Sequence, residues 1–307
     1  MDNRHDYHKS ILQKYFHNVK KIKSDREFKS CDNLILNATQ FNSNSTTGIL
    51  VIPGIWYPRE AYYKLCSGLH KRFNVVVYDQ RSHCLSQGNF NIDKMIQDLI
   101  GVTEQYVRDN HIKELYLVGH SLGGYLSFIA SSKGLPVEVK GQILLAPPIS
   151  FKPLLKTMPE HLGLPIVYLL NLFKTIIPKY RSKIYKEYVS FNYFDFKKNP
   201  YYFCLRSDNP NNIIKELKFA DELSIFASNI HIHTLFIWGD NDRVLKIKND
   251  FPLYYTEFIE KNIKLSKCLY LKLLKKMSHH FNYNDKNFIQ ISGDNNVILN
   301  DIFSFIE

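Results

Sequence analysis

The chain has 307 residues, of which 45% are hydrophobic and 14% aromatic. It can therefore bury a large core, which excludes a disordered protein. Lysine and arginine number 40 against 29 aspartates and glutamates, so the formal net charge is +11 and favours contact with anionic surfaces. Because the lysines are dispersed and no nucleic-acid-binding signature accompanies them, we do not expect a nucleic acid as partner.

The five cysteines are scattered and form no CxxC pair, so we expect neither a disulfide framework nor a zinc site. The polar N-terminus lacks the apolar core of a secretory signal. The most apolar stretch, Leu162 to Ile177, is interrupted by polar residues and is shorter than the roughly 20 residues that a bilayer span needs. We therefore expect a cytoplasmic protein, with peripheral contact to an anionic membrane as an alternative.

Residues 10–23 place apolar side chains at helical spacing between lysines. This pattern predicts an amphipathic helix that packs on its own domain or, alternatively, lies on a membrane or a partner. Beyond it, apolar runs predict strands at 49–52, 74–78, 114–118, 142–145, 234–238 and 268–274, with helices at 62–72, 92–110 and 122–133 between them. Near-continuous apolar strands separated by helices are typical of an α/β fold with a parallel sheet covered on both faces.

The alternation of strands and helices stops between residues 151 and 230, a stretch rich in apolar residues, aromatic residues, lysine and proline. We interpret it as an inserted, mostly helical lid over the site, the alternative being a surface excursion without function. The predicted organisation is an N-terminal helical segment 1–30, a core 31–150, the lid 151–230 and a second part of the core 231–307.

A Gly-x-Ser-x-Gly pattern, Gly119-His120-Ser121-Leu122-Gly123, follows an apolar strand and leads into a helix. At such a corner it predicts a nucleophile elbow, a turn so sharp that it exposes the serine hydroxyl. Side chains at positions 119 or 123 would collide with the neighbouring strand or helix. The alternative is a glycine-rich turn with a bystander serine.

A serine nucleophile needs a base and an orienting carboxylate, which follow the elbow in the order Asp or Glu, then His. Asp242 lies just past a predicted strand and can point at the site, whereas Asp240 fits a turn residue that bonds local backbone. An aspartate-rich turn without a catalytic role is the alternative. For the base, His279 follows the last predicted strand and is preferred, with His280 as the alternative.

An oxyanion in the reaction needs two backbone N–H donors. Leu122 supplies one at a helix N-terminus, where the dipole favours negative charge. Ile55 is the best placed second donor, because Pro53 in the same loop has no N–H. No metal or organic cofactor is implied, since His231-x-His233 lacks a third ligand.

With these residues in view, the chain resembles the α/β-hydrolase superfamily, especially its monoacylglycerol lipase, lysophospholipase and serine-aminopeptidase-like branch, over residues 46–150 and 230–285. Besides the elbow, the resemblance includes a segment like D-x-R-G-H-G-x-S from Asp79 to Ser86 with Ser82 and Cys84 for glycines, a His-Gly-x loop with Pro53 for histidine, the G-x-x-D turn ending at Asp242, and the last-strand loop with Ser278 for glycine.

The resemblance implies an α/β-hydrolase fold and a serine hydrolase of carboxylic esters that uses Ser121, His279 and Asp242. The apolar lid and basic surface favour a lipid ester, such as a monoacylglycerol or lysophospholipid, over other small esters as substrate. The same triad would serve an acyltransferase or thioesterase, or an aminopeptidase-like hydrolase that holds a substrate amine with Glu160 or Glu187. A non-catalytic binding protein on this fold is the remaining alternative.

Overall fold

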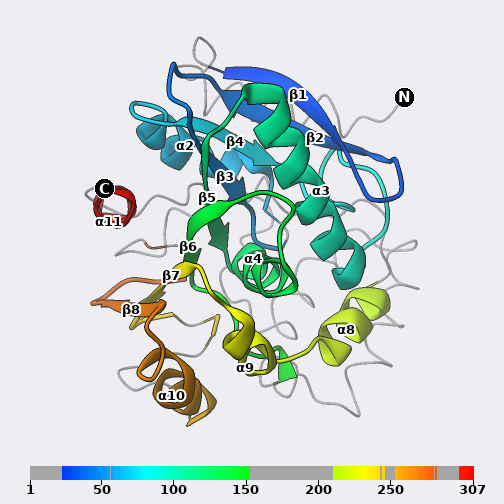
Figure 1. The fold of residues 1–307 in the computed structure, drawn as a ribbon. Coiled ribbons are helices and arrows are strands. Elements are labelled where there is room, and N and C mark those ends of the chain that lie inside the picture. The colour runs from blue at the N-terminus through cyan, green and yellow to red at the C-terminus, as the bar shows by residue number, and fades with distance from the viewer. Residues whose placement is uncertain are drawn as a thin grey trace.

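The computed structural model describes residues 23–55, 57–152, 210–242, 244–245, 253–279, 281 and 297–307. These residues form an eight-stranded sheet with the strand order β1-β2-β4-β3-β5-β6-β7-β8 (Figure 1). The first two strands are antiparallel to their neighbours, and the others run parallel. The predicted α/β-hydrolase fold with a mostly parallel sheet is confirmed.

The strands are β1 (Lys23–Lys29), β2 (Ile35–Phe41), β3 (Thr47–Ile52), β4 (Asn74–Tyr78), β5 (Glu114–His120), β6 (Val139–Leu145), β7 (His233–Gly239) and β8 (Leu269–Leu274). The helical elements are η2 (Arg59–Tyr62), α2 (Tyr63–Leu69), α3 (Ile92–Asn110), α4 (Leu122–Lys133), α8 (Pro210–Phe219), α9 (Leu223–Phe226), η4 (Ala227–Asn229), α10 (Leu253–Phe258), η5 (Ile259–Ile263) and α11 (Val297–Ile306). Each predicted strand is present, with ends shifted by up to three residues.

The N-terminal prediction needs a correction, because part of the segment 1–30 belongs to the sheet. Residues 23–29 form β1, which pairs antiparallel with β2 from Lys23↔Phe41 to Lys29↔Ile35. The rest of the predicted helix, residues 10–22, lies outside the described residues. The core of the fold therefore includes residues 23–29, which lie before the boundary expected at 31.

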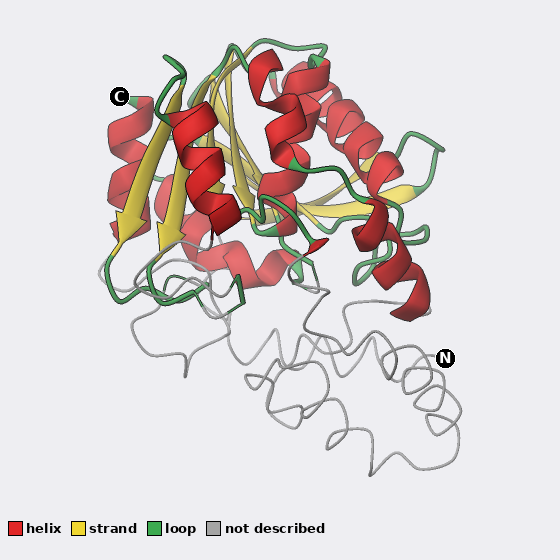
Figure 2. Cartoon of the chain, turned by 90° about the horizontal axis from the view of Figure 1, so that it is seen from below, coloured by secondary structure: helices red, strands yellow, loops and turns green. Residues whose placement is uncertain are grey.

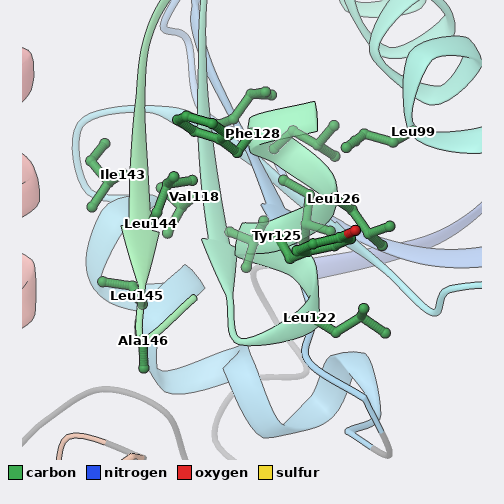
Figure 3. Packing of buried hydrophobic residues seen from close by; sticks show 14 of the residues in the cluster. Leu99, Val118, Leu122, Tyr125, Leu126, Phe128, Ile143, Leu144, Leu145 and Ala146 are labelled. Carbon is green, nitrogen blue, oxygen red and sulfur yellow. The ribbon is translucent and has the colours of Figure 1, made fainter. Parts of the chain in front are cut away.

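Helices cover both faces of the sheet (Figures 1 and 2). α3 and α4 pack against each other on one face, and α2 and α11 contact each other on the other. On the α4 face of the sheet, the ring of the buried Phe128 lies 5.6 Å from the ring of Phe236 on β7, whereas Ile143 of β6 points to the opposite face (Figure 3). Burial of each such apolar side chain contributes about 1.5–3 kcal/mol, so the loop that leaves β5 stands on a rigid support.

The chain changes direction across the sheet between β3 and β5. β4 lies on one side of β3 and β5 on the other, and the register pairs Ile52 with Gly119 near the carboxyl ends of these strands. In open α/β sheets the crevice for ligands lies at such a switch point. Here it brings the loop that begins at Pro53 next to the turn at Ser121.

Of the predicted lid, the structure describes residues 151–152 and 210–230, and α8, α9 and η4 lie in the second range. The Glu216 side chain on α8 accepts hydrogen bonds from the backbone N–H of Ile92 (3.0 Å) and from the Asn91 side chain (3.3 Å). These bonds fix α8 to the start of α3. Glu160, Glu187 and the apolar stretch 162–177 lie outside the described residues.

Within the described ranges, no helix combines the length and the apolar character that crossing a lipid bilayer requires.

Candidate active site

The turn at Ser121 has the geometry of a nucleophile elbow. Ser121 adopts φ 51° and ψ −119°, a backbone conformation that residues other than glycine rarely take, between the end of β5 and the start of α4. Its backbone N–H donates to the carbonyl oxygen of Leu145 on β6 at 2.8 Å. This bond and the buried flanking elements hold the strained residue in place.

The two glycines around the elbow are required by space, as the sequence predicted. A Cβ on Gly119 would lie 2.6 Å from the carbonyl oxygen of Gly123 and 2.7 Å from Cα of Gly124. A Cβ on Gly123 would overlap the carbonyl oxygens of Ile52 and Pro53 at the end of β3. Strand, turn and helix therefore approach each other too closely for any side chain at these positions.

Three predicted site residues lie in one hydrogen-bonded chain, although they come from the ends of three different strands. His279 Nε2 lies 3.0 Å from Ser121 Oγ, and His279 Nδ1 lies 2.7 Å from Asp242 Oδ2. Asp242 is fully buried, His279 is 4% exposed and Ser121 is 8% exposed. The second carboxylate oxygen of Asp242 accepts the backbone N–H of Leu245 at 2.9 Å.

The loops after β7 and β8 bind each other and so place the carboxylate and the imidazole. The backbone N–H of Asn241 donates to the carbonyl oxygen of Met277 at 3.0 Å, and the side chain of Asp240 accepts the backbone N–H of Lys276. The side chain of Asp240, which the sequence predicted to bond the backbone of its own turn, instead bonds the backbone of the loop after β8. His280, the alternative base, lies outside the described residues.

The two predicted oxyanion donors lie near the serine. Leu122 is the first residue of α4, so its N–H is among the first four helix N–H groups without an acceptor inside the helix. Ile55 is half-buried and follows Gly54, whose Cα would carry a Cβ only 3.1 Å from Cβ of Ser121. The loop from Pro53 to Ile55, which we call the oxyanion loop, therefore lies directly against the elbow.

The segment that resembles D-x-R-G-H-G-x-S supplies buried ion pairs. Asp79 accepts the backbone N–H of Arg59 at 2.8 Å and also pairs with its guanidinium group. Arg81 forms a second pair, in which its Nε lies 2.7 Å from Oδ2 of Asp98 on α3. The first pair anchors η2, the turn that follows the oxyanion loop.

A contact network around His120 was not predicted from the sequence. Its Nδ1 lies 2.8 Å from the Tyr62 hydroxyl, and its Nε2 lies 3.0 Å from the backbone carbonyl oxygen of His279. Burial, followed by the proximity of His279, lowers the pKa of His120 to about 3. The imidazole next to Ser121 is therefore neutral at ordinary pH.

One group of potential metal ligands occurs in the described part of the chain, and its carboxylates are paired with an arginine. Cys31, Asp32 and Asp98 bring their ligand atoms within 4.8 Å of one another, but the guanidinium group of Arg81 binds both carboxylates there and supplies the positive charge. His233 stacks on the ring of Tyr270 at 5.8 Å.

Residues 46–286 match the family model described as "Serine aminopeptidase, S33" (Hydrolase_4). The chain belongs to this family of α/β-hydrolases. No curated protein is similar enough in sequence to match it.

Solved structures with the same fold include an esterase, Pf2001 from Pyrococcus furiosus, at 17% identity and a TM-score of 0.62, covering 94% of this chain and 91% of that one. A membrane phospholipase A described as a bacterial virulence factor is 15% identical with a TM-score of 0.65, covering 97% and 92%. The esterase RhEst1 from Rhodococcus sp. ECU1013 is 14% identical with a TM-score of 0.57, covering 92% and 98%. At these identities the similarity establishes the fold.

Proposed function

We propose that the protein hydrolyses carboxylic esters, with Ser121 as nucleophile, His279 as general base and Asp242 as the carboxylate that orients the base. The observation that carries this proposal is the continuous chain of hydrogen bonds from Ser121 Oγ through both imidazole nitrogens to Asp242. Because a carboxylate accepts at Nδ1, that nitrogen carries the proton and Nε2 is left to accept one from the serine.

In the proposed reaction Ser121 Oγ attacks the ester carbonyl carbon while His279 Nε2 takes the hydroxyl proton. The oxyanion that forms is stabilised by the N–H groups of Leu122 and Ile55. Collapse of this tetrahedral intermediate breaks the ester C–O bond, and the departing alcohol takes the proton from His279. Water then attacks the acyl-serine with His279 again as base, which releases the carboxylic acid and restores the serine hydroxyl.

We infer a lipid ester, such as a monoacylglycerol or lysophospholipid, as the substrate class. The inference is supported by the apolar, aromatic composition of residues 151–230 and by the net charge of +11. A phospholipase A among the structures of the same fold agrees with it. If acyl chains bind along apolar side chains, each additional buried CH₂ contributes up to about 0.8 kcal/mol.

The first test is covalent labelling with a fluorophosphonate, combined with turnover of p-nitrophenyl esters of increasing acyl length. Wild-type protein should be labelled and should prefer medium or long chains over acetate. Ser121→Ala should lose both labelling and turnover and keep its fold, because the substitution removes one hydroxyl and opens no core cavity. Full turnover by the purified Ala variant would contradict the mechanism, and an acetate preference would contradict the lipid substrate.

Replacement of His279 and His280 one at a time by glutamine tests the base. Loss of the true base should lower kcat by several orders of magnitude, and we expect this for His279→Gln alone. An inactive His280→Gln variant beside an active His279→Gln variant would shift the assignment by one residue. Product analysis with an added alcohol and with aminoacyl p-nitroanilides distinguishes hydrolysis from acyl transfer and from aminopeptidase activity.

A further inference from the structure

Buried hydrogen bonds connect the oxyanion loop to the loop that carries His279. The backbone N–H of Gly54 donates to the Tyr62 hydroxyl at 2.8 Å, the hydroxyl lies 2.8 Å from His120 Nδ1, and His120 Nε2 lies 3.0 Å from the carbonyl oxygen of His279. Tyr62 and His120 are each 1% exposed. Ser121 directly follows His120 in the chain.

The direction of every proton in this connection follows from the chemistry of its two ends. A carbonyl oxygen can only accept, so His120 Nε2 carries a hydrogen and donates it to His279. The ring is neutral, because the pKa of His120 is lowered to about 3, and Nδ1 is therefore an acceptor. The Tyr62 hydroxyl donates to Nδ1 and uses an oxygen lone pair to accept from Gly54.

We propose that Tyr62 and His120 are positioning residues that hold the oxyanion loop and the His279 loop at fixed places on either side of Ser121. The inference rests on the proposed function, because it assigns to these residues the geometry of the oxyanion donor at Ile55 and of the base. Ring packing supports the same arrangement, since the His120 ring lies 5.1 Å from the His279 ring and 5.7 Å from the Tyr57 ring.

The pair of Tyr62 and His120 matters because the two loops that it joins carry groups that act in the same reaction step. These groups therefore need fixed positions relative to each other. Ile55 directly follows Gly54, and the His279 carbonyl belongs to the residue whose imidazole takes the proton. Removing the Tyr62 hydroxyl takes away the acceptor of the Gly54 N–H and the donor to His120 Nδ1, both buried, which favours movement of the loop. A displacement of about 1 Å of a catalytic group lowers turnover by about 100-fold.

Tyr62→Phe is the test, and Tyr63→Phe is its matched control. Tyr63 is equally buried and adjacent in sequence, but its hydroxyl bonds Thr39 on β2 at 2.8 Å, away from the elbow. We expect Tyr62→Phe to lower kcat about 10- to 100-fold with KM changed less than about threefold. The affinity for a boronate that forms a tetrahedral adduct should fall by a similar factor. Tyr63→Phe should keep kcat within about twofold, and equal losses in both variants would overturn the proposal.

A double-mutant cycle tests the link between the two residues. His120→Leu removes both the acceptor for the Tyr62 hydroxyl and the donor to the His279 carbonyl, so it should lower kcat at least as much as Tyr62→Phe. Adding Tyr62→Phe to His120→Leu should then change kcat less than about threefold, since the two residues act as a unit. Multiplication of the two separate losses would mean independent, structural roles and would overturn the proposal.

The tautomer can be measured without substrate and without a variant. In protein with ¹⁵N-labelled histidine, His120 should keep a proton on Nε2 and none on Nδ1 from pH 5 to pH 8. A proton on Nδ1 at pH 7 would overturn the positioning proposal even if Ser121 is labelled and esters are hydrolysed. Conversely, the expected tautomer with no labelling of Ser121 would contradict the proposed function and leave the hydrogen-bonded connection standing.

Discussion

His120 is neutral beside Ser121, and this protonation state affects the stability of the fold. Its pKa in the folded protein is lowered from 6.5 to about 3 by burial and by His279. Below pH 6.5 the unfolded chain therefore binds a proton that the folded chain does not bind until about pH 3. The contribution of His120 to the free energy of unfolding is therefore fully present above pH 6.5. It falls as the pH drops, by up to about 1.4 kcal/mol per pH unit.

The pH dependence of the free energy of unfolding checks this prediction. Between pH 7.5 and pH 5, wild-type protein should lose about 2 kcal/mol more than His120→Gln, whose side chain does not titrate. Denaturant titrations of both proteins at each pH give the difference, in which the shared contributions of the carboxylates cancel. Parallel curves for the two proteins would mean that His120 titrates normally in the fold.

Some residues around Ser121 were predicted from the sequence and others were not, for a physical reason. Ser121, Asp242 and His279 follow strand ends, and the carboxyl ends of parallel strands meet at one edge, so local spacing was enough to bring them together. Tyr62 and His120 meet only because η2 folds back against the elbow. No local pattern marks a buried phenol for that role, although His120 stands inside the elbow motif itself.

Among the elements, the turn between β8 and His279 contains a residue in an unfavourable conformation. Lys276 has φ 60° and an exposed side chain, whereas its neighbour Lys275 is exposed without a positive φ. A left-handed conformation costs a residue other than glycine about 1–2 kcal/mol, and glycine loses about 0.5–1 kcal/mol through the flexibility of the unfolded chain. Lys276→Gly should therefore raise the free energy of unfolding by about 0.5–1 kcal/mol.

Lys275→Gly is the control, because it removes the same charge from the same turn. Without a positive φ to relieve, it should lower the free energy of unfolding by about 0.5–1 kcal/mol. Chemical denaturation of both variants measures the two changes, which should have opposite signs. A loss of stability in both would mean that the turn does not strain Lys276.

The strands at the first edge of the sheet show where sequence patterns fail for whole elements. The core strands are nearly continuous apolar runs and were predicted within a few residues of their ends. β1 has the sequence KSDREFK with Phe28 as its one buried residue, so it carries neither an apolar run nor a strict alternation. Its pairing with β2 depends on the backbone of a neighbour, and a segmental pattern cannot report it.

For the whole molecule, the fold class followed from the order of elements, because buried parallel strands separated by helices allow few arrangements. What the charged surface binds does not follow from the order of elements. The net charge of +11 comes from lysines and arginines dispersed along the chain, and composition alone does not separate a surface that binds lipid headgroups from a compositional bias.

Binding to lipid vesicles distinguishes these two origins of the charge. Each lysine or arginine near an anionic membrane contributes about 1 kcal/mol, and the attraction extends over a Debye length of about 10 Å at 0.1 M salt. If the basic surface meets the substrate membrane, Ser121→Ala, which leaves the lipid intact, should sediment with vesicles of phosphatidylcholine and phosphatidylserine much more than with phosphatidylcholine alone. The excess should fade in 1 M salt, where the Debye length is about 3 Å. Equal, salt-insensitive binding to both vesicles would assign the charge to composition and leave the ester itself as what the enzyme recognises.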